Sequence, residues 1–321
     1  MKNNFKKIFI TGGAGFIGSH VSEAFFENFK KSKIIILDKL TYAGNKAFLS
    51  SIINSKRVKF IKGDIANTKK YTKYLKNSDL AINIAAESHV DNSFLSPLNF
   101  TKTNTLGAHA FFLECIKNKV KKILHISSDE VYGEKTKGTS YEDQLVNPTN
   151  PYSASKAAAE ILINSYRYTY KKEIIMVRAN NIYGIRQFPE KLISTSIVNL
   201  IQKKTIPIHG NGQNIRYYLS AIDFANALII LVKKKDSGTY NIGSNYFEKN
   251  INIAKKICEL FKKNPIKHIA FTKDRLYNDK RYSVSSTKIR KLGWKPQRSL
   301  LKDLPMMIEW YQKNYKIFNK A

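Results

Sequence analysis

Residues 11–18 read Thr-Gly-Gly-Ala-Gly-Phe-Ile-Gly, and this stretch decides the fold of the chain. A short apolar segment, 6–11, leads into it and predicts a buried strand, and a helical segment, 19–30, follows it. Between the two lies the spacing Gly-x-Gly-x-x-Gly, which is typical of a strand-to-helix turn that binds a dinucleotide. In such a turn the N-terminus of the helix points at the pyrophosphate. The stretch therefore predicts a dinucleotide-binding βαβ unit.

The second strand of this unit is predicted at 33–38 and ends in an acidic residue, Asp38. Asp38 follows the last glycine of the turn by about 20 residues, where a carboxylate accepts a hydrogen bond from the ribose 2′-hydroxyl of NAD and repels the 2′-phosphate of NADP. We therefore expect NAD as the cofactor. The residues expected to contact it are Gly12, Gly15, Phe16, Ile17, Gly18, Asp38, Lys39, Asp64, Ile65, Ala85, Ala86, Asn104, Tyr152 and Lys156.

Strand-like and helix-length segments continue to alternate along the chain. The further predicted strands are 58–61, 80–84, 122–126 and 173–178, and a helix is predicted at 99–116. This alternation predicts an α/β fold, a Rossmann-like doubly wound parallel sheet with a smaller, mixed α/β C-terminal substrate domain. The predicted domains are an NAD-binding domain, 1–181, with a returning segment at about 217–243, and a substrate domain, 182–321.

Five polar residues bring acid–base chemistry to the ends of the predicted strands. Ser128, Asp129 and Glu130 directly follow a strand, at the edge where open α/β sheets place their sites. Tyr152 and Lys156 open a later helical segment, and their i, i+4 spacing puts both on one face. A nearby ammonium group favours the phenolate, so we expect Lys156 to lower the pKa of Tyr152 and make it a base. These five residues are the predicted catalytic group.

Composition and charge exclude several classes of protein. At 321 residues and 43% hydrophobic content, the chain has ample material for a folded core, and no segment approaches the ~18 apolar residues of a membrane span. The two cysteines indicate neither a disulfide framework nor a metal site, and we expect the cytoplasm as the compartment and no metal. The net charge of +31 comes mostly from lysines scattered from end to end, so no specific nucleic-acid partner is predicted.

Together the motifs resemble the extended short-chain dehydrogenase/reductase family and, over nearly the whole chain, its dTDP-glucose 4,6-dehydratases. The glycine turn and the Tyr-x-x-x-Lys pair mark only the superfamily. The adjacent acids Asp129 and Glu130 are the specific part, because related epimerases lack both acids and related decarboxylases carry Ser at the first. The matching segments are 11–18, 38–45, 85–91, 129–133, 151–156, 188–193, 279–282 and 292–296.

The resemblance implies a homodimeric enzyme that dehydrates a nucleoside-diphosphate glucose. Tyr152 would take the proton of the sugar 4-hydroxyl while hydride passes to NAD⁺, and Ser128 would hydrogen-bond to the 4-oxygen. Glu130 would remove the C5 proton, and Asp129 would protonate the departing 6-hydroxyl, before hydride returns to C6. Two adjacent carboxylates of opposite role need separated pKa values, so we expect the pKa of one of them to be raised.

The nucleotide is less firmly indicated than the reaction. UDP-glucose 4,6-dehydratases share the core motifs, so dTDP-glucose is favoured, and a UDP-glucose 4,6-dehydratase or another sugar-nucleotide epimerase or dehydratase is the alternative. A non-catalytic NAD-sensing or RNA-binding protein is a second alternative, against which stands the intact catalytic group. The expected substrate-binding residues are Ser88, Asn181, Lys191, Leu192, His209, Arg216 and Asn278. Departures from the family pattern occur at Ser128, Ile185-Arg186, His209, Tyr217-Tyr218 and Asn278.

Overall fold

Seven parallel strands form the main sheet of the computed structural model, which describes residues 5–234 and 237–319. The predicted domain ranges also include 1–4, 235–236 and 320–321, which lie outside the described residues. In spatial order the strands are β10 (Gly238–Ile242), β6 (Glu173–Ala179), β5 (Lys122–Ile126), β4 (Leu80–Asn83), β1 (Lys7–Thr11), β2 (Lys33–Asp38) and β3 (Val58–Lys62). Every neighbouring pair is parallel, which confirms the doubly wound sheet. Of the segment predicted to return at about 217–243, β10 pairs with β6 at the edge of the main sheet. Residues 217–220 instead belong to a strand, Ile215–Ser220, of a separate three-stranded sheet.

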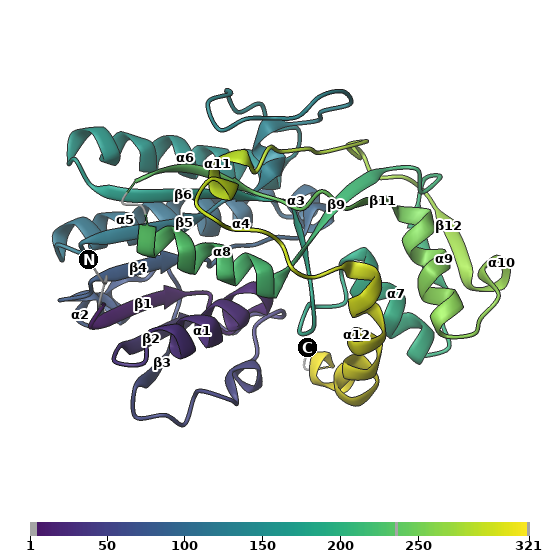
Figure 1. Ribbon diagram of the computed structural model, residues 1–321, viewed down its shortest axis with the longest axis horizontal. Coiled ribbons are helices and arrows are strands. Elements are labelled where there is room, and N and C mark those ends of the chain that lie inside the picture. The colour runs from purple at the N-terminus through teal and green to yellow at the C-terminus, as the bar shows by residue number, and fades with distance from the viewer. Residues whose placement is uncertain (1–4, 235–236, 320–321) are drawn as a thin grey trace.

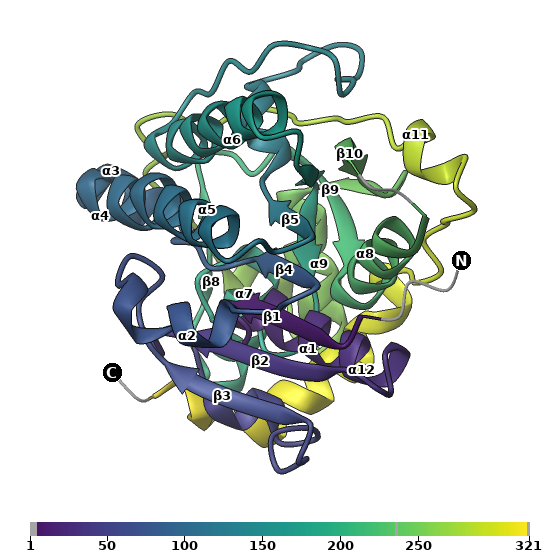
Figure 2. The same cartoon turned by 90° about the vertical axis from the view of Figure 1, so that its left-hand side faces the viewer.

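Successive side chains of the central strands alternate between two buried cores. On β1, Ile8 and Ile10 belong to one core, whereas Phe9 belongs to the other. The period of two puts neighbouring residues on opposite faces, so a strand buried on both faces is apolar throughout. Helices α1 (Phe16–Asn28) and α8 (Ala221–Lys234) pack on the first face. The second face is covered by α2 (Thr72–Leu75), α5 (Ala108–Lys117) and α6 (Pro151–Thr169), and Figure 2 shows both layers.

The predicted helix at 99–116 is not continuous. The structure has α3 (Val90–Leu95) and α4 (Pro97–Phe100), then a π-helix, η3 (Thr101–Gly107), before α5 begins. Within the π-helix the Asn104 side chain accepts from the backbone N–H of Glu87 and donates to its carbonyl, at 2.8 and 3.0 Å. The period of apolar residues does not reveal this wider turn, because α- and π-turns bury nearly the same side chains over one turn.

A smaller lobe lies at one end of the sheet (Figure 1) and has its own buried core. Its strands form a three-stranded and a two-stranded sheet. The strands are β7 (Asn181–Tyr183), β9 (Ile215–Ser220) and β11 (Phe247–Lys249), and then β8 (Ile206–His209) and β12 (Ile269–Thr272). The helices are α7 (Leu192–Ile201), α9 (Asn250–Leu260), α10 (Pro265–His268) and α12 (Leu300–Asn314). The remaining short elements are η1 (Lys46–Leu49), η2 (Thr68–Lys70), η4 (Asp129–Tyr132), α11 (Thr287–Arg290) and η5 (Tyr315–Phe318).

Neither a membrane-spanning helix nor a metal-binding cluster occurs among the described residues. None of the helices there is both long and apolar enough to cross a bilayer. Within the same ranges, no three or more His, Cys, Asp or Glu side chains come together in a way that could hold a metal ion.

Candidate active site

A cavity of about 400 Å³ lies between the carboxyl ends of the central strands and the smaller lobe. The chain runs from β1 outward to β2 and β3, and then crosses back to β4, β5 and β6 on the other side of β1. This reversal is the point where open α/β sheets bind their ligands. Both lobes line the cavity, so a ligand there would contact the glycine turn on one side and the loops of the smaller lobe on the other.

The glycine turn has the shape that a pyrophosphate needs. Gly12 has a φ of +67°, and a Cβ there would lie 2.6 Å from the backbone nitrogen of Ala85. A Cβ at Gly18 would lie 1.9 Å from the Gly12 carbonyl oxygen, so turn and helix touch directly. A Cβ at Gly15 would meet only the Gly12 oxygen, at 3.4 Å, and no side chain caps α1 at Gly15. The N–H groups that begin α1 are therefore free to bind an anion, and the cradle fits a dinucleotide.

Asp38 lies at the end of β2 with its carboxylate held by backbone donors. Its Oδ2 accepts from Ala14 N–H at 2.9 Å and its Oδ1 from Leu40 N–H at 2.8 Å. Burial raises the pKa of Asp38, and these hydrogen bonds oppose that rise. A carboxylate has about four acceptor sites, so it can still accept from a ribose hydroxyl beside these backbone donors and Gly15 N–H. Beside it, Lys39 forms an ion pair with Asp64 at 2.8 Å.

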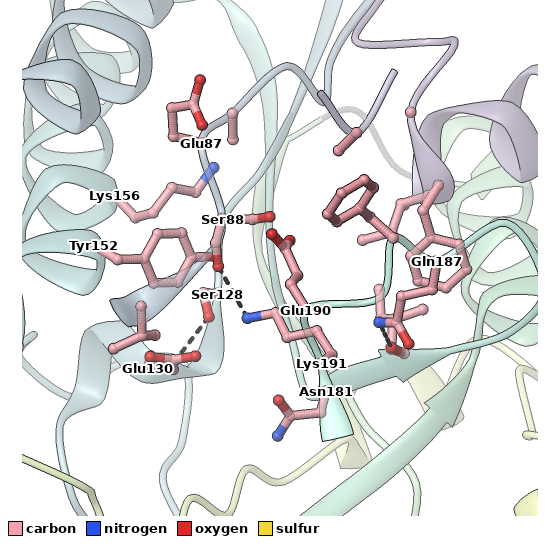
Figure 3. A pocket seen from close by; sticks show the side chains of 18 of the residues that line it. Glu87, Ser88, Ser128, Glu130, Tyr152, Lys156, Asn181, Gln187, Glu190 and Lys191 are labelled. Atoms are coloured by element: carbon pink, nitrogen blue, oxygen red, sulfur yellow. Dashed lines mark hydrogen bonds between the residues drawn. The ribbon is translucent and has the colours of Figure 1, made fainter. Parts of the chain in front are cut away.

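The five predicted catalytic residues all line the cavity. Figure 3 shows four of them, Ser128, Glu130, Tyr152 and Lys156, close together at one wall. Ser128 caps η4, and its Oγ accepts from Glu130 N–H at 3.2 Å. Tyr152 and Lys156 project from α6 on the same face, as their spacing predicted. Lys156 Nζ donates to the carbonyl of Ile126, the last residue of β5, at 2.6 Å. The helix that carries the phenol and the ammonium is thus tied to the strand that precedes the two acids.

One of the two adjacent acids has a strongly raised pKa. Asp129 is buried, and the loss of solvent together with the neighbouring charge of Glu130 raises its pKa to about 7. Asn180 Nδ2 donates to Asp129 Oδ2 at 2.8 Å and opposes the rise, as do Arg216 and Ser128. Asp129 can therefore hold a proton near neutral pH, as expected of one of the two acids.

The expected lowering of the Tyr152 pKa is wrong. Burial, and then the charge of Glu130, raise the pKa of Tyr152 above its usual value. The Lys156 ammonium does not offset this rise, because it is directed at the Ile126 carbonyl. Burial also lowers the pKa of Lys156 to about 8, while Glu160 opposes that change. Tyr152 is therefore a neutral phenol at neutral pH.

The predicted substrate residues line the other side of the cavity. Lys191 Nζ donates to the Ser88 carbonyl at 3.0 Å, and Arg216 donates to Asn278 Oδ1 at 3.3 Å. The lining includes all seven residues predicted to contact the substrate, namely Ser88, Asn181, Lys191, Leu192, His209, Arg216 and Asn278. It also includes the predicted cofactor residues, with one exception. Asn104 does not line the cavity, because its amide is fully used by the Glu87 backbone and by Ser155 Oγ, at 2.9 Å.

Among the lining residues without a role assigned from the sequence are two amides and two carboxylates. Asn150 and Asn180 bind the two adjacent acids through their amide groups. Glu190 lies across the cavity from Tyr152, and Glu87 lies beside Lys156 (Figure 3). Burial together with the charge of Glu190 raises the pKa of Glu87. The Asn-Pro pair before Tyr152 is a recognisable helix start, so it could have located Asn150 but not its contact with Glu130.

Residues 9–307 match the family model described as GDP-mannose 4,6 dehydratase. The chain belongs to this family. A trifunctional UDP-glucose 4,6-dehydratase/UDP-4-keto-6-deoxy-D-glucose 3,5-epimerase/UDP-4-keto-L-rhamnose-reductase of Arabidopsis thaliana is 40% identical over 96% of this chain, although the match spans only 47% of the plant protein. The dTDP-D-glucose 4,6-dehydratase of Dictyostelium discoideum is 37% identical over 96% of this chain and 82% of its own length. The chain thus spans about half the length of the first relative and most of the second.

The fold of the family member from Streptomyces venezuelae is also similar. The crystal structure of this dTDP-glucose 4,6-dehydratase, DesIV, with NAD bound, superposes with a TM-score of 0.94 at 32% identity, and the match covers 97% of this chain and 98% of that chain. The match covers nearly the whole of both chains, so both lobes take part in the agreement.

Proposed function

We propose that this protein is an NAD-dependent dTDP-glucose 4,6-dehydratase, which converts dTDP-glucose to dTDP-4-dehydro-6-deoxyglucose. One observation carries the proposal: Asp129, with a pKa raised to about 7, lies directly beside Glu130 in the cavity that holds Tyr152 and Lys156. Oxidation at C4 alone needs only the Tyr-Lys pair. Loss of water from C5 and C6 needs in addition a base and an acid next to each other, and this pair supplies both.

The first step is the oxidation of C4. When bound, NAD⁺ supplies the hydride acceptor for C4 and later the hydride for C6. Tyr152 takes the proton of the 4-hydroxyl, and Ser128 holds the 4-oxygen. Lys156 adds a buried basic side chain to the same wall of the cavity. Burial and the charge of Glu130 raise the pKa of Tyr152, so the phenol must lose its proton before it acts as the base.

The second step is the loss of water. The ketone at C4 acidifies the hydrogen at C5, and Glu130 takes that proton. Asp129 donates its proton to the 6-hydroxyl, which leaves as water. When hydride reaches C6, Glu130 returns a proton to C5. The 4-ketone is retained in the product, so Tyr152 releases the proton that it took from the 4-hydroxyl to solvent. Asp129 then regains a proton from solvent, which its pKa near 7 permits.

A second substrate, UDP-glucose, is favoured by a specific observation. The 40% identical plant relatives are named UDP-glucose 4,6-dehydratases, whereas the relatives named for dTDP-glucose are 36–37% identical. His209, Arg216 and Asn278, which line the substrate side, include positions where this chain departs from the dTDP-glucose pattern. We place dTDP-glucose first and UDP-glucose second.

The assembly that we propose is a homodimer in the cytoplasm. Five large apolar side chains on α3, α4, η3 and α6 are 57–81% exposed. Helices α3, α4 and α6 lie side by side in Figure 2, and η3 contacts α6. Such a patch on neighbouring helices suits a second copy of the chain. The residues are Leu95, Leu98, Leu106, Ile161 and Tyr168. Sedimentation should give a dimer that Leu98→Glu converts to a monomer, whereas a monomeric wild-type protein would contradict this assembly.

The proposed reaction is tested by substrate choice. The purified protein is incubated with dTDP-, UDP-, GDP- and CDP-glucose, and the 4-keto product is followed by its absorbance in alkali. We expect product from dTDP-glucose, with UDP-glucose next. Product from GDP-glucose alone, or from none of the four, would overturn the proposal.

A further inference from the structure

Asn150 uses the two ends of one amide group for two different tasks. It is the N-cap of α6, and its Oδ1 accepts from Ser153 N–H at 2.9 Å. Its backbone N–H donates to Ser153 Oγ at 3.2 Å, which completes a capping box before Pro151. At the other end, Asn150 Nδ2 donates to Glu130 Oε2 at 3.3 Å.

The cap fixes the direction of the amide. If the oxygen and nitrogen changed places, the amide NH₂ would face the N–H of Ser153, and two donors would meet. The oxygen must therefore point into the helix and the NH₂ must point at Glu130. Asn150 is 6% exposed and Glu130 9% exposed, so neither end exchanges its partner readily for water. The amide is a rigid link between the first turn of α6 and the carboxylate of Glu130.

The hydrogen bond from Asn150 to Glu130 connects the helix that carries the base for C4 oxidation with the base for the loss of water. The same first turns of α6 carry Tyr152 and Lys156, whereas Glu130 comes from η4 after β5. In the proposed reaction, Tyr152 acts at O4 and Glu130 at C5, which belong to adjacent carbons of one ring. A displacement of about 1 Å at a reacting group can slow a reaction by about 10²-fold. The Asn150 amide can therefore control where Glu130 lies relative to Tyr152.

We propose that Asn150 is a positioning residue that holds Glu130 in register with Tyr152 for removal of the C5 proton. The inference rests on the proposed function. A positioning role differs from a purely structural one. If Asn150 only capped the helix, its loss would lower the stability of α6 and slow every step of the reaction equally. A positioning role predicts that C4 oxidation survives while C5 proton removal fails.

Two substitutions of Asn150 separate the capping of α6 from the hydrogen bond to Glu130. Asn150→Ser keeps a good N-cap but removes the donor to Glu130. Asn150→Asp also keeps the cap but turns a carboxylate toward Glu130. The matched control is Asn264→Ser, because Asn264 likewise precedes a proline and caps a helix, with its Oδ1 accepting from Ile266 N–H at 2.9 Å, but is exposed and far from the cavity lining.

The experiment uses the full-length protein with its bound cofactor and dTDP-glucose. It records NADH formation in a single turnover, exchange of the C5 hydrogen with deuterated water, and product. We expect Asn150→Ser to form NADH at the wild-type rate, while C5 exchange and product formation fall on the order of 10- to 100-fold. Asn150→Asp should be slower than Asn150→Ser in exchange, and Asn264→Ser should match wild type throughout.

Two results would overturn the inference, and they are distinguishable from each other. If wild type makes product and Asn150→Ser matches it in C5 exchange, or loses all steps equally, Asn150 does not position Glu130 and the proposed function stands. If wild type makes no product from any sugar nucleotide, the proposed function fails and the role of Asn150 fails with it.

Discussion

Replacing Asp129 by Asn should stabilise the NAD-free protein at the same time as it slows the reaction. Asp129 is 3% exposed, and its pKa is about 7 in the folded chain against 3.8 for an unperturbed Asp. The folded state therefore holds this proton more tightly than the unfolded state. The stability that comes from it is fully present below pH 3.8 and is lost as the pH rises through about 7.

The magnitude follows from the same two values. Each pKa unit corresponds to about 1.4 kcal/mol, so ionisation of Asp129 costs the folded wild-type protein about 4 kcal/mol in total. Of this, about 3 kcal/mol falls between pH 5 and pH 8. The amide of the Asp129→Asn variant does not ionise, and its carbonyl oxygen can still accept from Asn180. The free energy of unfolding of Asp129→Asn minus that of wild type should therefore rise by about 3 kcal/mol over this range.

Urea unfolding of both proteins at pH 5 and at pH 8 measures this difference, and all other titrating groups cancel because both proteins share them. Glu130→Gln is the control, since the charge of Glu130 contributes to the raised pKa of Asp129. This variant should show a smaller loss of stability than wild type between the two pH values. A difference between Asp129→Asn and wild type that does not change with pH would refute the reasoning.

Three further changes test separate parts of the site. Tyr152→Phe removes the base for C4 oxidation, so NADH formation and product should fall about 10²–10⁴-fold, and a loss of only a few-fold would assign that role to another group. Glu130→Gln should still oxidise C4 but accumulate NADH with little C5 exchange, and wild-type exchange would show that Glu130 is not the base. Because Asp38 can hold the ribose hydroxyls, the denatured protein should release NAD(H) when analysed by mass spectrometry, and NADP(H) would contradict this.

The parts of the fold that the sequence predicted are those set by local pattern. The strand 33–38 was predicted with its observed bounds, because a parallel strand buried on both faces is a continuous apolar run. The π-helix at Thr101–Gly107 was missed, since it depends on contacts with the loop after β4 and not on local periodicity. Asn104 was expected to contact the cofactor, but it is buried and lies outside the cavity lining. The direction of its amide, away from the cavity, depends on tertiary contacts.

The residues of the site also fall into two groups, those that local sequence pattern predicts and those that depend on tertiary contacts. Tyr152 and Lys156 were recognisable because their spacing is helical, and the acids because they are adjacent. The amide donors to those acids were not, since Asn150 lies 20 residues from Glu130 and Asn180 lies 51 residues from Asp129. The raised pKa of Tyr152 was not predicted for a related reason. It follows from burial and from the acids that the fold places nearby, neither of which the Tyr-Lys spacing contains.

The fate of the hydrogen at C4 tests the central claim most directly. The protein is incubated with dTDP-glucose carrying deuterium at C4, in ordinary water, and the product is analysed by NMR. If Asp129 and Glu130 eliminate water after C4 oxidation, the product is the 4-keto-6-deoxy sugar, with the deuterium at C6 and a solvent hydrogen at C5. If the deuterium is instead found at C4 of an epimerised sugar that has kept its 6-hydroxyl, the chain is an epimerase and the roles given to the two acids are wrong.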